Sequence, residues 1–229
     1  NYTLQTANKD TFELMLFVNH PDKDPSGKPI QPDKTLTEIE RFKKDYPDLN
    51  VQVIYKVIPI KEAKIGYVRK YLNDLTALRH HDRGDGKQEL FLVSNDADNK
   101  GMAPEYLQNF IDKFEKNKNI DSYLGQLDWD PNVYVKNPLI HIGTRLFQYF
   151  GVINRHKGGG AGSSGANFAF RSSIYAAIDG YEPINAGEDS NLGDKILDAR
   201  SGARKHRGVG FAGARVSRLY TSARRAEKV

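Results

Sequence analysis

The chain of 229 residues is 38% hydrophobic and has no cysteine, so it has the size of one globular domain and excludes disulfides, thiolate metal sites and cysteine nucleophiles. It also contains no run of about 18 apolar residues that could cross a bilayer. The net charge of +5 is uneven, because residues 200–229 carry nine Lys and Arg against one Glu, a local charge of +8. This basic end predicts either a polyanionic partner (phosphates of a small ligand, nucleic acid or anionic lipid) or a solvated tail.

The first half of the chain alternates strand and helix signals. Apolar or β-branched runs predict strands at residues 12–18, 51–57 and 89–94. The capping-box pattern Thr35-Leu36-Thr37-Glu38 predicts a helix that Pro47 closes. A stripe of large side chains predicts a second helix, which a turn at residues 82–86 ends: Tyr67, Tyr71, Leu75 and Leu78.

The second half continues in the same way. Pro104 opens a helix with an i, i+3, i+4, i+7 apolar repeat: Leu107, Phe110, Ile111 and Phe114. A further helix is predicted after Pro138, on the spacing of Leu139, Ile142, Leu146 and Phe150. Short strands are expected at residues 122–127, 166–170 and 216–221, with a short helix capped by Ser172 and ended by Gly180 and a longer one beginning near Glu188.

This alternation predicts an α/β fold with a mainly parallel central sheet flanked by helices. Ligands of such sheets bind beyond the carboxyl ends of the strands. We expect one domain over residues 1–229, with a nucleotide-binding half at residues 1–130 and an acceptor-binding half at residues 131–229. Neither end resembles a natural terminus, so further segments are expected on both sides.

Two acidic clusters carry most of the chemical signal. Asp96 and Asp98 directly follow the apolar strand at 89–94, where paired carboxylates suit a hard divalent cation that holds a diphosphate. An exposed Asn/Asp-rich turn is the structural alternative. Glu188 and Asp189 open a helix; they either complement the helix dipole or place a carboxylate opposite an acceptor hydroxyl.

Other motifs are weaker. The glycine-rich stretch 158–165 contains the spacing GxGxxG, but it precedes a strand and is therefore not a dinucleotide fingerprint. It is either a surface loop or a segment that closes over substrate. The six histidines form no HExxH motif, and Trp129, the only tryptophan, is either a packing anchor or a surface for stacking a sugar ring.

Three blocks, taken in order, resemble a family-2 glycosyltransferase with the GT-A fold. They are the strand followed by Asn95-Asp96-Ala97-Asp98, the stretch at 165–172 followed by Ile178-Asp179-Gly180-Tyr181, and Gly187-Glu188-Asp189-Ser190. The resemblance covers about residues 89–197. It implies an enzyme that transfers a sugar from a nucleotide-diphosphate sugar, with a UDP-sugar favoured as donor, to a carbohydrate or glycoconjugate hydroxyl.

The resemblance also implies residue roles. Asp98 would bind Mg²⁺ or Mn²⁺ and Asp96 would contact the donor, while Asp189 would act as the base of a single, inverting displacement and Glu188 would contact acceptor or sugar. A loop after the catalytic helix would close over the diphosphate, with Lys205 and Arg207 as donor contacts and His206 as a candidate metal ligand.

Two departures from the family limit this reading. After the first predicted strand, Asn19-His20-Pro21-Asp22 replaces the usual acidic pair, which leaves base recognition unassigned. The Gln-x-x-Arg-Trp block and membrane helices of processive members are absent, which favours single or short-chain additions. We expect a cytoplasmic protein or one at the inner face of a membrane, with a peripheral membrane contact compatible with the basic end and no nucleic-acid partner.

Three other functions stay open from the residues alone. A nucleotidyltransferase of related fold would release pyrophosphate. A non-catalytic polyanion-binding protein would bind its partner with an affinity that falls steeply as the salt concentration rises. A glycosidase would need neither a nucleotide nor a metal ion. The oligomeric state is not predicted.

Overall fold

The computed structural model describes residues 1–85, 88–129, 132, 135, 138–147, 150, 165–201, 209–211 and 218–221. Its internal contacts divide the chain into two units. The β1–β2 unit comprises residues 7–87 and 181–188, and the β3–β9 unit comprises residues 1–6, 88–180 and 189–229. The predicted halves at residues 1–130 and 131–229 concern ligand binding and stay a prediction.

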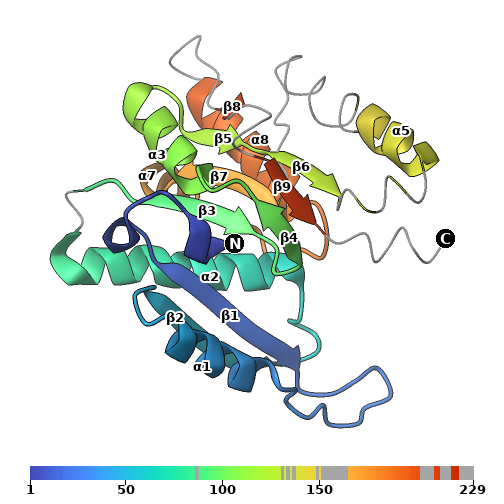
Figure 1. Cartoon of the computed structure of the whole chain (residues 1–229). Helices are drawn as coiled ribbons and strands as arrows, with labels where there is room; N and C mark the ends of the chain where they lie inside the picture. Colours follow the sequence, from blue (N-terminus) through green and yellow to red (C-terminus); the bar gives the residue numbers. More distant parts are fainter. Residues whose placement is uncertain are drawn as a thin grey trace. The chain divides into compact units, whose positions relative to one another are not determined.

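The β1–β2 unit contains one parallel strand pair with helices. Strand β1 (Leu14–Pro21) pairs with β2 (Val51–Ile58), with Leu14 opposite Val51 and Pro21 opposite Ile58. Helix α1 (Thr35–Asp45) connects them, and α2 (Ile65–His80) follows β2 (Figure 1). Short helical turns lie at η2 (Lys9–Thr11) and η3 (His81–Asp85).

The β3–β9 unit contains two small sheets of mixed direction. The first has the order β3-β7-β5-β8, in which β7 (Asn167–Arg171) runs antiparallel to both β3 (Phe91–Asn95) and β5 (Ser122–Leu124), and β8 (Val209–Phe211) runs parallel to β5. In the second, β9 (Arg218–Thr221) lies between antiparallel β4 (Asn99–Met102) and parallel β6 (Gln126–Trp129). The described helices of this unit are η1 (Tyr2–Leu4), α3 (Tyr106–Lys116), α5 (Pro138–Phe147), α7 (Ser172–Ala177) and α8 (Glu188–Ser201).

The core of the β3–β9 unit is aromatic. Phe114 of α3 stacks on Phe91 of β3 at 4.6 Å between ring centroids and meets Tyr123 of β5 edge-on at 4.9 Å. Phe168 and Phe170 of β7 are fully buried, as are Leu192 and Ile196 on one stripe of α8: all four side chains have 0% exposure. Among the described residues, no helix is both long and apolar enough to span a membrane.

Most predicted elements are present, with three corrections. The described sheets are small and mix parallel with antiparallel pairs, so the predicted mainly parallel central sheet is wrong for the described strands; β7 pairs antiparallel on both sides. The strand predicted at 122–127 is two strands, separated at Gly125. The capping box is absent: α1 begins at Thr35 with Lys34 as N-cap, and the Thr35 amide donates to the Asp33 side chain instead.

The apolar stripes also differ from expectation in burial. In α2 the buried positions are Gly66, Arg69 and Asn73, while Leu78 of the predicted stripe is 54% exposed. The helix predicted after Pro138 is confirmed as α5, but Leu139, Ile142 and Leu146 of the predicted stripe are exposed. Periodicity therefore predicted both helices, but not which of their faces is covered.

Candidate functional site

Asp96 and Asp98 lie in the turn between β3 and β4, at the carboxyl end of β3. Both side chains are half-buried. The Thr221 hydroxyl of β9 donates a hydrogen bond to Asp98 Oδ1 at 3.1 Å, which ties this carboxylate to the second sheet. The turn thus presents two carboxylates separated by one residue, as the sequence predicts.

Asp189 lies beside the same end of β3. The Gly165 amide donates to Asp189 Oδ2 at 2.7 Å, and the Gly165 carbonyl accepts from Ser94 Oγ at 3.1 Å. Ser94 is two residues before Asp96 in the chain, so one buried glycine contacts both the β3 end and the start of α8. The Ser190 amide donates to Asp189 Oδ1 at 2.7 Å. The carboxylate is therefore oriented by two backbone amides.

A buried polar network supports this strand end. Asn95 of β3 lies opposite Asn167 of β7. With the Asn95 amide oriented to satisfy its neighbours, its oxygen accepts from Tyr2 and its nitrogen donates to the Tyr106 oxygen at 2.9 Å. The Tyr106 hydroxyl donates to Asn167 Oδ1 at 2.7 Å, and Asn167 Nδ2 donates to the Gln126 carbonyl at 2.9 Å. Five elements (η1, β3, α3, β6 and β7) are thus joined by side-chain hydrogen bonds that begin at Asn95, the residue before Asp96.

Burial sets the electrostatics of this network. Tyr106 and Asn167 are both 0% exposed. Desolvation raises the pKa of Tyr106 well above its usual value of 10.0, and it also raises the pKa of Tyr2. Both phenols are therefore neutral donors at physiological pH. Gly125 is required here, because a Cβ at this position would lie 2.1 Å from Asn167 Oδ1.

Glu188, the neighbour of Asp189, belongs to the β1–β2 unit and is buried there. Its Oε1 accepts a hydrogen bond from Arg69 Nε of α2 at 3.0 Å, and both side chains are at most 10% exposed. The start of α2 is close to the chain before Glu188: the Gly66 amide donates to the Ile184 carbonyl, and a Cβ on Gly66 would lie 2.1 Å from the Glu182 carbonyl oxygen. Glu188 thus helps to hold α2 against residues 182–188, and its contact with a sugar or acceptor stays a prediction.

The sequence analysis missed Arg69, Gly66 and the Tyr106–Asn167 pair. Gly66, Arg69 and Asn73 share a face of α2 at helical spacing, but that spacing alone does not distinguish a buried face from a solvated one. No local signal links Tyr106 to Asn167, which are 61 residues apart.

Several predicted site residues lie outside the described part of the chain. These are Lys205, His206 and Arg207, residues 158–164 of the glycine-rich stretch, and the side chain of Trp129. Over the described ranges, no three His, Asp or Glu side chains converge as a protein-only metal cluster. Two carboxylates at Asp96 and Asp98 nevertheless fit Mg²⁺ or Mn²⁺, because such ions commonly take one or two carboxylates and complete their shell with substrate phosphates and water.

No protein-family model matches the chain, and no curated protein sequence matches it significantly. Similarity is found among solved structures. The mannosyltransferase PcManGT from Pyrobaculum calidifontis, solved in complex with GDP-Man and Mn²⁺, matches with a TM-score of 0.50 and 15% sequence identity. The match covers 93% of this chain and 58% of that protein, so this chain spans a little over half the length of its structural relative. At this identity the likeness concerns the fold alone: the chain is a mixed α/β protein whose fold is similar to that of this mannosyltransferase.

Proposed function

We propose that this chain is the donor-binding part of a metal-dependent, inverting glycosyltransferase that moves a sugar from a nucleotide-diphosphate sugar to an acceptor hydroxyl. One observation carries the proposal most directly: Gly165 accepts from Ser94 and donates to Asp189. That contact supports a single site in which the Asp96/Asp98 turn and the Asp189 carboxylate act on the same substrate. The GT-A likeness supports the same class of enzyme.

Asp96 and Asp98 would hold the donor's diphosphate through Mg²⁺ or Mn²⁺. The bound cation would neutralise charge on the departing nucleoside diphosphate. The hydrogen bond from Thr221 orients Asp98, and the half-buried Asn95, the residue directly before Asp96, is held by its hydrogen bonds to Tyr2 and Tyr106. Lys205, Arg207 and His206 are proposed as further contacts to the diphosphate and cation.

Asp189 would take the proton from the acceptor hydroxyl as that oxygen attacks the anomeric carbon. The bond from the anomeric carbon to the diphosphate oxygen breaks in the same step, so the sugar's configuration inverts. The amides of Gly165 and Ser190 keep the carboxylate in one orientation, which limits the entropy lost when the acceptor binds.

The donor is proposed as a UDP-sugar or a GDP-sugar. The family resemblance favours UDP, whereas the structural relative was solved with GDP-Man. A thermal-shift screen of UDP- and GDP-sugars with and without Mn²⁺ distinguishes the two, because a ligand selective for the folded state raises stability with its affinity. We expect one nucleotide class to raise the melting temperature only when Mn²⁺ is present.

The matched test uses Asp98→Ala against Asp112→Ala, an exposed carboxylate on α3. We expect Asp98→Ala to remove the Mn²⁺-dependent shift and Asp112→Ala to keep it. Equal shifts in both variants would contradict the metal role of Asp98. Product analysis separates the alternatives: a nucleoside diphosphate supports glycosyl transfer, and pyrophosphate would instead identify a nucleotidyltransferase.

A further inference from the structure

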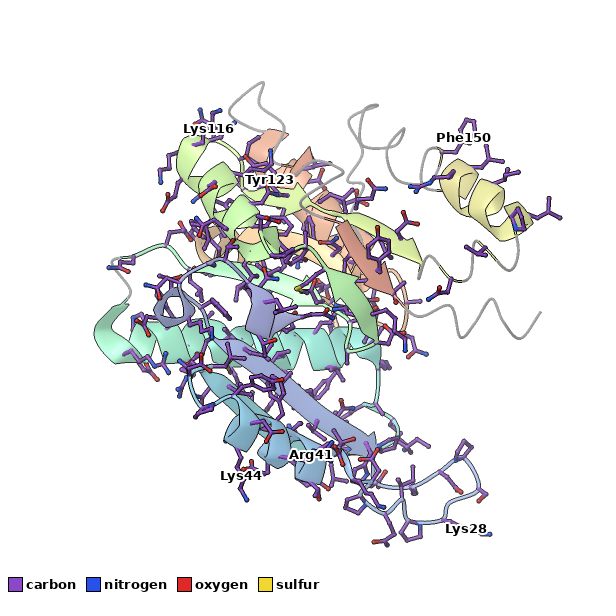
Figure 2. The ribbon with its side chains drawn as sticks, viewed as in Figure 1. Lys28, Arg41, Lys44, Lys116, Tyr123 and Phe150 are labelled. Carbon is purple, nitrogen blue, oxygen red and sulfur yellow. The ribbon has the colours of Figure 1, made fainter. Side chains whose placement is uncertain are left out.

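Two consecutive polar side chains close strand β3. The strand begins with the apolar residues Phe91, Leu92 and Val93 and ends with Ser94 and Asn95. Figure 2 shows β3 beside its partner strand β7, with the side chains as sticks. Successive side chains of a strand point to opposite faces, so the two polar side chains leave the strand end in different directions. Each can therefore hold a different part of the surrounding chain.

These two side chains hold the backbone at Gly165 and Ala166. Ser94 Oγ donates to the Gly165 carbonyl at 3.1 Å. With the Asn95 amide oriented to satisfy its neighbours, its nitrogen donates to the Ala166 carbonyl at 3.1 Å. Both Gly165 and Ala166 are buried, so water competes little for these carbonyls. The end of β3 thus fixes Gly165 from its carbonyl side.

The amide side of Gly165 contacts the candidate base. The Gly165 amide donates to Asp189 Oδ2 at 2.7 Å. Glycine has the least restricted backbone of all residues, so its amide keeps a fixed direction only where other contacts hold the residue. Ser94 supplies such a contact at the carbonyl of the same residue. Because both contacts of Gly165 use backbone atoms, Ser94 is the side chain through which this link can be changed.

We infer that Ser94 is a positioning residue: its hydroxyl holds Gly165, whose amide keeps the Asp189 carboxylate in the orientation that receives the acceptor proton. This inference rests on the proposed role of Asp189 as the base. Ser94 acts through Gly165 and is not itself a catalytic residue. Because a small displacement of a catalytic group can lower a rate by about 10²-fold, loss of this hydroxyl should lower turnover without weakening donor binding.

The first test does not depend on turnover. Hydrogen exchange of the Gly165 amide is followed by NMR in the full chain, in wild type, Ser94→Ala, Ser94→Thr and Asp189→Ala. We expect exchange to become at least about threefold faster in Ser94→Ala and Asp189→Ala, and to stay near the wild-type rate in Ser94→Thr, which keeps the hydroxyl. An unchanged rate in Ser94→Ala would overturn the inference. Equal acceleration of amides throughout β3 and β7 would also overturn it, because the fold and not one contact would then be lost.

Tyr123→Phe is the matched control. The Tyr123 hydroxyl of β5 donates to the Lys113 carbonyl at 3.0 Å, and Figure 2 labels Tyr123. This variant therefore also removes one hydroxyl that donates to a backbone carbonyl in the β3–β9 unit. We expect it to leave both the exchange of the Gly165 amide and turnover at their wild-type values. Acceleration at Gly165 equal to that in Ser94→Ala would overturn the specific role of Ser94.

The second test separates positioning from binding. GDP-mannose and UDP-glucose, each with Mn²⁺, are the donor probes, and water is the acceptor. Asp189 would take a proton from water as the water oxygen attacks the anomeric carbon and the nucleoside diphosphate leaves. Release of the nucleoside diphosphate gives kcat and KM. We expect Ser94→Ala to lower kcat by about 10–10²-fold with an unchanged donor KM, and Ser94→Thr to restore kcat.

The outcomes separate this inference from the proposed function. A wild-type kcat in Ser94→Ala, with turnover lost in Asp189→Asn, would overturn the role of Ser94 and keep Asp189 as the base. A raised donor KM with an unchanged kcat would also overturn it, because Ser94 would then serve donor binding. No release from either probe by wild type would count against the proposed function, and exchange of the Gly165 amide would then decide whether Ser94 positions Asp189.

Discussion

The buried polar side chains and the exposed apolar side chains of this protein lie in different regions and obey different constraints. Around Asn167 in the β3–β9 unit, and at Arg69 and Glu188 in the β1–β2 unit, polar groups are buried and hydrogen-bonded to one another. On α5, leucine and isoleucine side chains are exposed instead. Where polar groups are buried, the stability of the fold depends on single side-chain contacts. Where apolar side chains are exposed, the fold tolerates their substitution. Single substitutions in the two regions should therefore change the free energy of unfolding by very different amounts.

The largest loss of stability is expected from Arg69→Met. It leaves the Glu188 carboxylate buried without its guanidinium, which costs about 3–5 kcal/mol of unfolding free energy. Urea denaturation followed by circular dichroism measures this loss. The double variant Arg69→Met/Glu188→Leu should recover most of it, because no unpaired charge is then buried; a double variant no more stable than the single one would contradict this account of the pair.

Gly125→Ala should follow in magnitude. The new methyl group would meet Asn167 Oδ1, so either the network or the β5–β6 junction must shift, at about 1–3 kcal/mol. Gly101→Ala in β4 is the matched control, since its nearest neighbour atom would lie 3.5 Å away, an ordinary contact. Equal melting temperatures for the two variants would show that the Asn167 contact tolerates the added group.

Tyr106→Phe should lower stability by about 1–2 kcal/mol at neutral pH, because Asn167 loses a buried donor. The same tyrosine predicts a pH dependence. Its pKa is raised by burial, so its contribution to stability is complete below pH 10.0, the usual tyrosine pKa, and is lost as the pH rises above that value. Urea midpoints measured at neutral and alkaline pH should therefore fall less steeply in Tyr106→Phe than in wild type; identical slopes would contradict the burial of this phenol.

The smallest effect is expected on α5. Leu146→Ser should change the unfolding free energy by no more than about 0.5 kcal/mol, because this side chain is 53% exposed. Phe168→Ala in β7, by contrast, should cost about 3–5 kcal/mol. A large loss for Leu146→Ser would mean that α5 packs through this residue.

Local patterns predicted the elements well and their partners poorly. The apolar repeat from Leu107 to Phe114 predicted α3, and the β-branched run predicted β2, because both depend on neighbouring residues. The antiparallel pairing of β7 with β3 joins segments more than seventy residues apart. No local pattern encodes that pairing, so the sheet was wrongly expected to be mainly parallel.

The site was predicted in the same uneven way. Residue types and order identified Asp96, Asp98 and Asp189 as candidates, and the structure places Asp189 and Ser94 on a shared glycine. Arg69 was missed, because a charged residue in a helical pattern is expected on the solvent-exposed face, and its buried partner Glu188 is known only from the structure. The exposure of α5 was missed for the converse reason: hydrophobic periodicity identifies an apolar face but not whether the rest of the chain covers it.

The central claim is that Asp189 acts as a base beside the cation-binding turn of Asp96 and Asp98. Asp189→Asn tests it most directly, with Asp198→Asn on the exposed side of α8 as control, by measuring donor affinity and sugar transfer in the same preparations. We predict that donor affinity is retained in both variants while transfer by Asp189→Asn falls by about 10²–10⁴-fold. Transfer at the wild-type rate in Asp189→Asn would contradict the assignment of the base.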